Sequence, residues 1–190
     1  MQIILASQSP RRKELLAAMG LSFTVAVRDV DETFPHELDP TAAVRYIAEK
    51  KAQAFLGEAP DALVVTADTI VTIDGRILGK PKDESHAVEM LTTLSGRQHD
   101  VITAVALLHN GTVEVFHDRT EVYFRNLQPD EITYYIRNYR PFDKAGAYGI
   151  QEWIGMVAIE KIVGSYTNVV GLPTAKLNDV LRNRFSPALL

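Results

Sequence analysis

One cationic segment of the sequence combines side chains that could bind phosphate. Residues 7–13 read SQSPRRK, in which Ser9 suits a helix N-cap and Pro10 suits the first helical position. The three cations that follow would oppose the helix dipole. A bound anion would compensate them, because free backbone N–H groups, serine hydroxyls and arginines all bind phosphate oxygens. The segment predicts a phosphate site at a helix start, and a capped helix with a solvated basic face is the alternative.

A carboxylate inside an apolar run is the second candidate for chemistry. Asp68 is the one charged residue of ALVVTADTIVTI, residues 62–73, which is the strongest strand signal in the chain. A buried charge is costly unless it is paired, coordinated or solvated in a cleft. Strand periodicity places Asp68 on one face with Thr66. Asp68 is therefore expected in a ligand cleft, with an edge position or a structural ion pair as the alternative.

Further candidates come from lysines on one helix and one loop. Lys51 follows Lys50 on a predicted helix with a clear apolar stripe, and small alanines beside it leave room for a ligand. Lys80 and Lys82 flank a proline in the loop GKPKD, which could hold both ammonium groups over a phosphate. Taken alone, lysines in such a loop more often serve solubility.

An acidic loop residue and an amide side chain complete the candidates. Glu32 lies in a polar loop and, with Asp68, could ligate Mg²⁺ or Mn²⁺. Gln151 ends the segment DKAGAYGIQ, whose small residues allow close backbone approach, and its amide suits the edge of a base. A tight turn between core elements is the alternative there.

The elements that must position these residues alternate between strands and helices. Strands are predicted at 3–6, 22–27, 62–73, 100–108, 112–124 and 156–162, and helices at 11–19, 41–56, 83–94, 129–138 and 173–184. Asp74-Gly75 and Asn110-Gly111 predict hairpin turns. This order predicts one α/β domain over residues 1–190, a twisted mixed sheet with helices on both sides, and a frayed tail at 186–190.

Composition limits the classes of function. The chain has 190 residues, 46% of them hydrophobic, and a net charge of −4, which disfavours general nucleic-acid binding. There is no cysteine, no apolar run long enough for a membrane span, no Walker loop and no GxSxG motif. A cytoplasmic protein with a small anionic ligand, and with neither a nucleic-acid nor a membrane partner, is expected.

Together these segments resemble the Maf family of nucleotide pyrophosphatases, from residue 3 to about residue 180. The motifs that carry the resemblance are LASQSPRRKELL, VDE at 30–32, EKKA at 49–52, TADTIV, GKPKD, DKAGAYGIQ and GSYTNVVGLP. The resemblance implies an ITPase-like (Maf/Ham1) α/β fold with a deep cleft between two lobes, a homodimer, and Mg²⁺- or Mn²⁺-dependent hydrolysis between the α and β phosphates.

The resemblance also implies a role for each candidate. Asp68 would be the general base and a metal ligand, and Glu32 a metal or water partner. Six others would bind phosphate or act on the leaving group: Ser7, Ser9, Arg12, Lys51, Lys80 and Lys82. The last three, Arg11, Thr69 and Gln151, would select the nucleobase. The combination of Arg11, Thr69 and Gln151 resembles that of the branch of the family that acts on dTTP, UTP and some modified pyrimidines, rather than that of the branch that prefers 7-methyl-GTP. A nucleotide-sensing regulator of septum formation, working through a protein partner, is the alternative.

Overall fold

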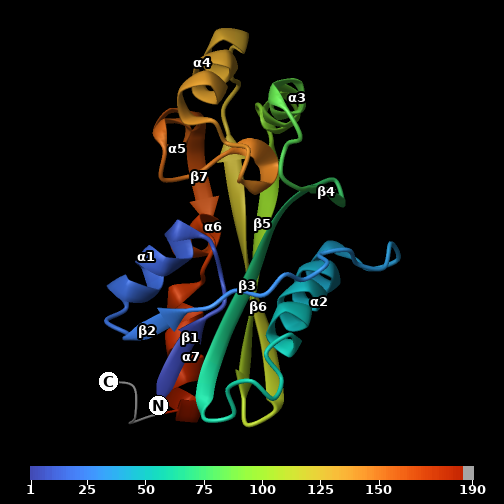
Figure 1. Cartoon of the computed structure of the whole chain (residues 1–190). Helices are drawn as coiled ribbons and strands as arrows, with labels where there is room; N and C mark the ends of the chain where they lie inside the picture. The colour runs from blue at the N-terminus through green and yellow to red at the C-terminus, as the bar shows by residue number, and fades with distance from the viewer. Residues whose placement is uncertain (186–190) are drawn as a thin grey trace. The chain divides into compact units, whose positions relative to one another are not determined.

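The computed structural model describes residues 1–185 and has a mixed α/β architecture (Figure 1). The elements in chain order are β1 (Gln2–Leu5), α1 (Pro10–Ala18), β2 (Phe23–Val25), α2 (Pro40–Gln53), β3 (Ala62–Ile73), β4 (Arg76–Leu78), α3 (Glu84–Leu94), β5 (Gln98–His109), β6 (Thr112–Phe124), α4 (Pro129–Tyr139), a 3₁₀ turn η1 (Ala145–Ala147), α5 (Trp153–Ala158), β7 (Ile159–Val163), α6 (Tyr166–Val170) and α7 (Thr174–Phe185). The expected frayed tail at 186–190 lies outside the described residues. Across residues 1–185, no helix is long and apolar enough to cross a membrane.

The strands form one mixed sheet, as predicted. Within the described residues it has seven strands, in the order β2-β1-β3-β5-β6-β7, with β4 paired to β3 off this path. The strand β1 runs parallel to both β2 and β3, whereas β3–β4 and β6–β7 are antiparallel. The turn between β5 and β6 is Asn110-Gly111, and both residues have positive φ, 49° and 73°. Those angles are typical of the type I′ hairpin that the dipeptide predicts.

The described part of the chain divides into two compact units. The first unit holds Met1–Asp68, Thr103–Asp118 and the residues from Gly171 onward, and the second holds Thr69–Ile102 and Arg119–Val170. The division falls inside β3, β5 and β6, so each of these strands contributes residues to both units. The general base candidate Asp68 is the last residue of its segment in the first unit.

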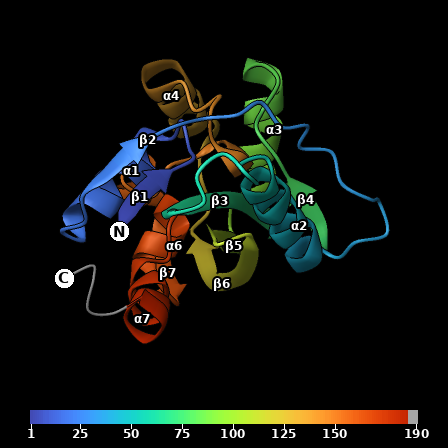
Figure 2. The same ribbon diagram turned by 60° about the horizontal axis from the view of Figure 1, so that its bottom comes forward.

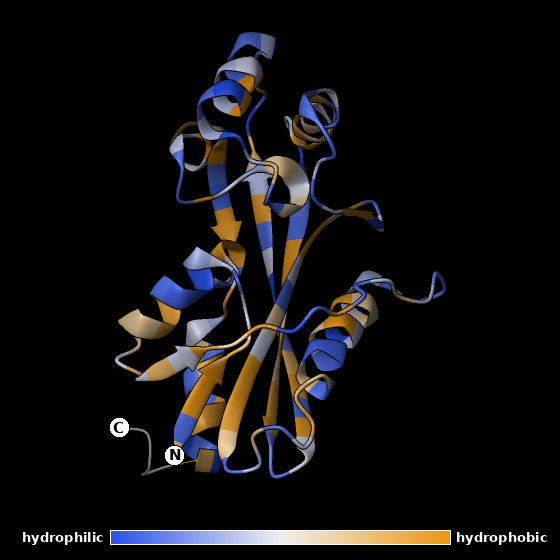
Figure 3. Ribbon diagram, viewed as in Figure 1, coloured by the Kyte–Doolittle hydropathy of each residue, from blue (hydrophilic) through white to orange (hydrophobic). Residues whose placement is uncertain are grey.

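The first unit packs helices on both faces of its strands. Alternate β3 residues Leu63, Val65 and Ala67 join one apolar cluster with side chains of α1 and α7. The intervening Thr66 faces α2, because its hydroxyl bonds a carbonyl of that helix. Figures 1 and 2 show α1 and α7 on one side of β1 and β3 and α2 on the other. In Figure 3 this part of β3 is coloured hydrophobic, whereas much of α1 is hydrophilic.

The second unit has its own core between α3, α4 and α5 and the ends of the long strands. Its cluster includes Val71 of β3, Leu91 of α3 and Phe124 of β6. Tyr135 of α4 is fully buried in this cluster, although it carries a hydroxyl. That hydroxyl must find polar partners, since a buried polar group without them is costly.

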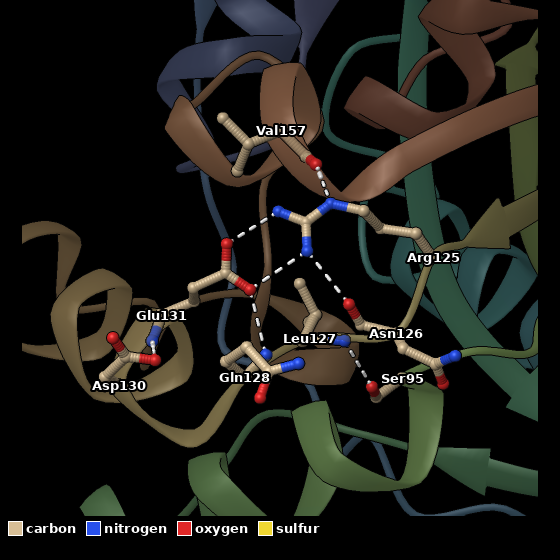
Figure 4. Close-up of polar contacts among 8 residues, drawn as sticks. All are labelled: Ser95, Arg125, Asn126, Leu127, Gln128, Asp130, Glu131 and Val157. Carbon is tan, nitrogen blue, oxygen red and sulfur yellow. Dashed lines mark hydrogen bonds and ion pairs between the residues drawn. The ribbon is translucent and has the colours of Figure 1, made fainter.

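An ion pair fixes the start of α4 (Figure 4). The two guanidinium nitrogens of Arg125 donate to the two oxygens of Glu131, at 2.9 and 2.7 Å, and Arg125 Nε also donates to the Val157 carbonyl. Glu131 accepts the Gln128 backbone N–H at 2.8 Å and so completes a capping box. The hydrogen bond and charge of Arg125 lower the pKa of Glu131 to about 2.

The boundaries of most elements agree with the sequence prediction, but one strand was wrong in part. Residues 156–158, predicted as strand, belong to helix α5, and β7 begins only at Ile159. The core side chains here are Ile154 and Ala158, four residues apart, which is helical spacing, whereas Met156 is 79% exposed. The short helix α6 was not predicted at all.

Candidate active site

Three charged residues of the first unit form one ion group around Lys51. Its ammonium nitrogen lies 2.7 Å from Asp68 Oδ1 and 2.8 Å from Glu32 Oε1. The Asp68 and Lys51 side chains are only 15% and 18% exposed, whereas Glu32 is half exposed. The half-buried strand carboxylate is therefore paired, as its partial burial requires, and the partner is a lysine that the sequence also singled out.

Packing of α2 on β3 explains why Lys51 reaches Asp68. The Thr66 hydroxyl donates to the Ala48 carbonyl at 2.7 Å, which fixes one turn of α2 over the strand. Lys51 lies three residues beyond Ala48 on the helix, and Asp68 lies two residues beyond Thr66 on the same strand face. The two side chains consequently meet. Thr66 was not among the predicted site residues, and its only sequence signal is a polar residue in an apolar strand.

The predicted phosphate segment begins a helix as expected. Ser9 is the N-cap of α1, its hydroxyl accepts the Arg12 backbone N–H at 3.5 Å, and Pro10 is the first helical residue. The buried Ser7 hydroxyl accepts the Ser9 backbone N–H at 3.2 Å. Both serines thus lie at the helix start, where an anion would meet the backbone N–H groups.

The Arg12 side chain folds back over this helix start. Its Nε donates to the Gly171 carbonyl at 2.8 Å, and a terminal nitrogen lies 3.4 Å from Ser7 Oγ. Gly171 has a φ of 127°, which an L side chain rarely adopts, so glycine is required where the chain presents this carbonyl. Gly171 belongs to the motif GSYTNVVGLP, and no sequence signal pairs it with Arg12.

Electrostatics links Arg12 to the ion group. Burial lowers the pKa of Arg12, while the Asp68 charge opposes this shift, and further contributions come from Arg11 and Glu32. A guanidinium stays protonated at neutral pH despite such a shift. The first unit therefore brings together Ser7, Ser9, Arg11, Arg12, Glu32, Lys51 and Asp68, all seven of the candidates that it contains.

The carboxylates fit a metal ion only in part. In the part of the chain that the structure describes, no group of three or more His, Cys, Asp or Glu residues could hold a metal by itself. Asp68 and Glu32 nevertheless share Lys51 as a neighbour. Mg²⁺ in nucleotide sites commonly takes one or two carboxylates and completes its shell with phosphate oxygens and water. The donor set therefore fits a cation held jointly with a triphosphate.

The remaining four candidates belong to the second unit. Thr69 is half-buried in β3, while Lys80, Lys82 and Gln151 are exposed. The loops of Lys80 and Gln151 are joined, because the Gly146 N–H donates to the Gly79 carbonyl at 3.1 Å.

Comparisons with known proteins agree on the family. A family model described as "Maf-like protein" matches residues 2–184. A Flavobacterium johnsoniae protein named dTTP/UTP pyrophosphatase is 47% identical over 95% of this chain and 93% of its own length. A Phocaeicola vulgatus protein of the same name is 49% identical over 95% of each chain. The solved structure of the Staphylococcus aureus Ham1 protein, 16% identical, matches with a TM-score of 0.52 over 95% of this chain and 100% of that one. This last likeness shows the fold.

Proposed function

The chain belongs to the Maf-like protein family, and on that premise we propose that it hydrolyses dTTP and UTP, and modified pyrimidine triphosphates, to the monophosphate and pyrophosphate. Relatives 46 to 49% identical over nearly the whole chain carry the name dTTP/UTP pyrophosphatase. The observation that carries the proposal is the ion group around Lys51, with its half-buried carboxylate Asp68, which lies in one unit with the helix start and Arg12.

Hydrolysis of a phosphoanhydride mainly requires positioning and stabilisation of charge. In the proposed reaction Asp68 takes a proton from a water molecule whose oxygen forms a bond to the α-phosphorus. The bond from that phosphorus to the bridging oxygen breaks, and pyrophosphate leaves with the electron pair. Lys51 holds the Asp68 carboxylate in place, because its ammonium donates to Oδ1 at 2.7 Å, and the second carboxylate oxygen has lone pairs for the water.

Cations and hydroxyls bind the phosphates in this proposal. Arg12 is held by Ser7 and the Gly171 carbonyl, so its guanidinium plane is fixed before substrate binds. Such preorganised donors stabilise developing charge better than mobile ones. Ser9 and the N–H groups of α1 would take phosphate oxygens, and Lys80 and Lys82 would add charge to the leaving pyrophosphate.

Three finer parts of the proposal rest on the family. A divalent cation, Mg²⁺ or Mn²⁺, would be held by Asp68 and Glu32 with the phosphates, and when bound it lowers the pKa of the attacking water. Arg11, Thr69 and Gln151 would select the pyrimidine. The enzyme would act as a homodimer in the cytoplasm, on a small nucleotide rather than on nucleic acid or a membrane.

Product analysis in H₂¹⁸O tests the proposal. The purified chain is incubated with Mg²⁺ or Mn²⁺ and a panel of dTTP, UTP, CTP, ITP and 7-methyl-GTP, and the products are examined by mass spectrometry. We expect the fastest turnover with dTTP or UTP, and ¹⁸O in the monophosphate, because water attacks the α-phosphorus. Orthophosphate as product, label in pyrophosphate, or binding without any product would overturn the proposal.

A further inference from the structure

A largely buried polar group lies near Gln151 in the second unit, and the proposed reaction does not use it. Lys144 Nζ is 3.1 Å from Glu152 Oε1, and these side chains are only 9% and 18% exposed. The fully buried Tyr135 hydroxyl donates to Glu152 Oε2 and accepts the Gly149 backbone N–H at 3.0 Å. Both carboxylate oxygens of Glu152 are thus engaged, one by an ammonium and one by a phenol.

Such a group is unexpected where only packing is needed. Taking two charges out of water is costly, and well-packed apolar residues of similar volume are often as stable. Each member also holds a particular part of one loop. Lys144 and Glu152 lie near its two ends, and Tyr135 reaches across from α4 to the Gly149 peptide. The group therefore defines the path of residues 144–152.

Gln151 lies within the turn that this group closes. The Glu152 backbone N–H donates to the Gly149 carbonyl at 3.0 Å, so Gln151 is the third residue of a four-residue turn. A Cβ placed on Gly149 would be 3.1 Å from each of three atoms: Gln151 Nε2, Glu152 Cδ and Lys144 Cε. The Gln151 amide therefore lies on the same side of Gly149 as the buried ion pair, while the residue itself is exposed.

Orientation of that amide matters for recognition of a pyrimidine. Uracil and thymine present a carbonyl and an N–H on the edge where cytosine presents an amino group and an acceptor nitrogen. A glutamine amide matches either pattern, because a rotation of 180° exchanges its oxygen and nitrogen. It distinguishes the two only where its surroundings fix the rotation. A carboxylate beside Nε2 does so, since it attracts the N–H groups and repels the amide oxygen.

We propose that Tyr135, Lys144 and Glu152 are positioning residues that fix the orientation of the Gln151 amide and so set the preference for uracil and thymine over cytosine. The inference rests on the proposed function for the role of Gln151. Glu152 supplies a carboxylate on the same side of Gly149 as the amide, Lys144 pairs with that carboxylate at 3.1 Å, and Tyr135 ties the carboxylate to the backbone of the turn.

A separate contact also ties this loop to the core of the second unit. The buried Tyr148 hydroxyl lies 2.8 Å from His99 Nε2, and both rings pack edge-on against Phe124. Burial lowers the pKa of His99 to about 3, so this contact stays neutral at physiological pH. Conservative variants at Tyr135 or Glu152 are thus expected to fold.

The test compares Tyr135→Phe and Glu152→Gln with the wild type and with Asp143→Asn. Asp143 also pairs with Lys144, at 2.8 Å, but its side chain is 57% exposed, so it is the matched control. One readout is the ratio of kcat/KM for UTP to that for CTP. The other is the ratio of the dissociation constants of α,β-methylene-UTP and α,β-methylene-CTP by calorimetry, which needs no turnover. Thermal unfolding reports on the fold.

We expect both ratios to fall about tenfold in Tyr135→Phe and Glu152→Gln, since a wrongly oriented amide leaves a donor or acceptor of the bound base unsatisfied, which costs about that factor. Asp143→Asn should keep the wild-type ratios. Variants that lose kcat equally on both substrates, or that only unfold at lower temperature with unchanged ratios, would overturn the inference, as would a wild type with no preference in binding. A wild type that binds the UTP analogue selectively but releases no pyrophosphate would defeat the proposed function and leave the positioning role supported.

Discussion

Replacement of Asp68 by asparagine separates the catalytic role of this residue from its structural one. The change removes the charge and the proton-accepting capacity but keeps the shape. Asparagine Oδ1 can still accept from Lys51, which also keeps Glu32 at 2.8 Å. The expected loss of stability is therefore the difference between a hydrogen bond to a charged acceptor and one to a neutral acceptor, about 1 kcal/mol of unfolding free energy. For a chain of this size that lowers Tm by about 2–4 °C.

The effect on turnover should be far larger. General base catalysis contributes about 10²- to 10⁴-fold, so kcat should fall by that factor, which corresponds to about 3–5 kcal/mol in the barrier. Unfolding cannot account for such a loss, because a domain with about 5 kcal/mol of stability or more stays folded after losing about 1 kcal/mol. The KM for dTTP should change much less than kcat, since the phosphate-binding residues remain and an asparagine oxygen can still ligate a cation.

Pyrophosphate release and thermal unfolding, measured on the same preparations, check both numbers. The matched control is Asp74→Asn, which removes an exposed ion pair with Arg97 at a hairpin turn. Asp74 has a φ of 51°, a region that asparagine also tolerates, so turnover and Tm should stay near wild type. If Asp68→Asn keeps kcat within about fivefold, Asp68 is not the base. If the Tm of Asp68→Asn falls by more than about 10 °C, the asparagine does not accept a hydrogen bond from Lys51 in place of the carboxylate, and the reasoning about stability is wrong.

The remaining predictions concern selection of the nucleobase, helix α2 and stability at acid pH. Gln151→Ala should change the ratio of kcat/KM among dTTP, UTP and CTP more than it changes affinity for pyrophosphate; an unaltered substrate profile would remove Gln151 from base selection. Thr66→Val should cost about 1 kcal/mol of stability, because the buried Ala48 carbonyl loses a donor, and it should lower kcat several-fold by loosening Lys51; a full wild-type kcat would contradict this. The pKa of Glu131 is depressed to about 2 by Arg125, so its stabilising effect is complete above about pH 4.5 and should be lost as pH falls toward 2. In Glu131→Gln, Tm measured over that range should lose this part of its pH dependence, and an unchanged profile would show that the pair does not stabilise the fold.

Local signals predicted most of the elements, because each depends on neighbours within a turn or two. Ser9, Pro10 and the apolar spacing that follows are enough to begin α1. Asn110-Gly111 is enough to join β5 to β6. One exception, besides the unpredicted α6, is α5, a helix of six residues. In so short a segment an alternation of apolar residues cannot be told from helical spacing, and only the packing of Ile154 and Ala158 decided it.

For the candidate site, the sequence by itself determined which residue types were unusual. A lone carboxylate in an apolar strand and three cations in a first helical turn both violate local rules, and such violations need no tertiary knowledge to be noticed. The partner of each of these unusual residues was decided only by the fold. Asp68 meets Lys51 seventeen positions away, and Arg12 meets the Gly171 carbonyl 159 positions away. The group of Tyr135, Lys144 and Glu152 likewise had no signal along the chain. A charge within an apolar stretch of sequence indicates that a partner is required. Which residue becomes the partner depends on how helices pack on strands, and that packing is determined by contacts far apart in sequence.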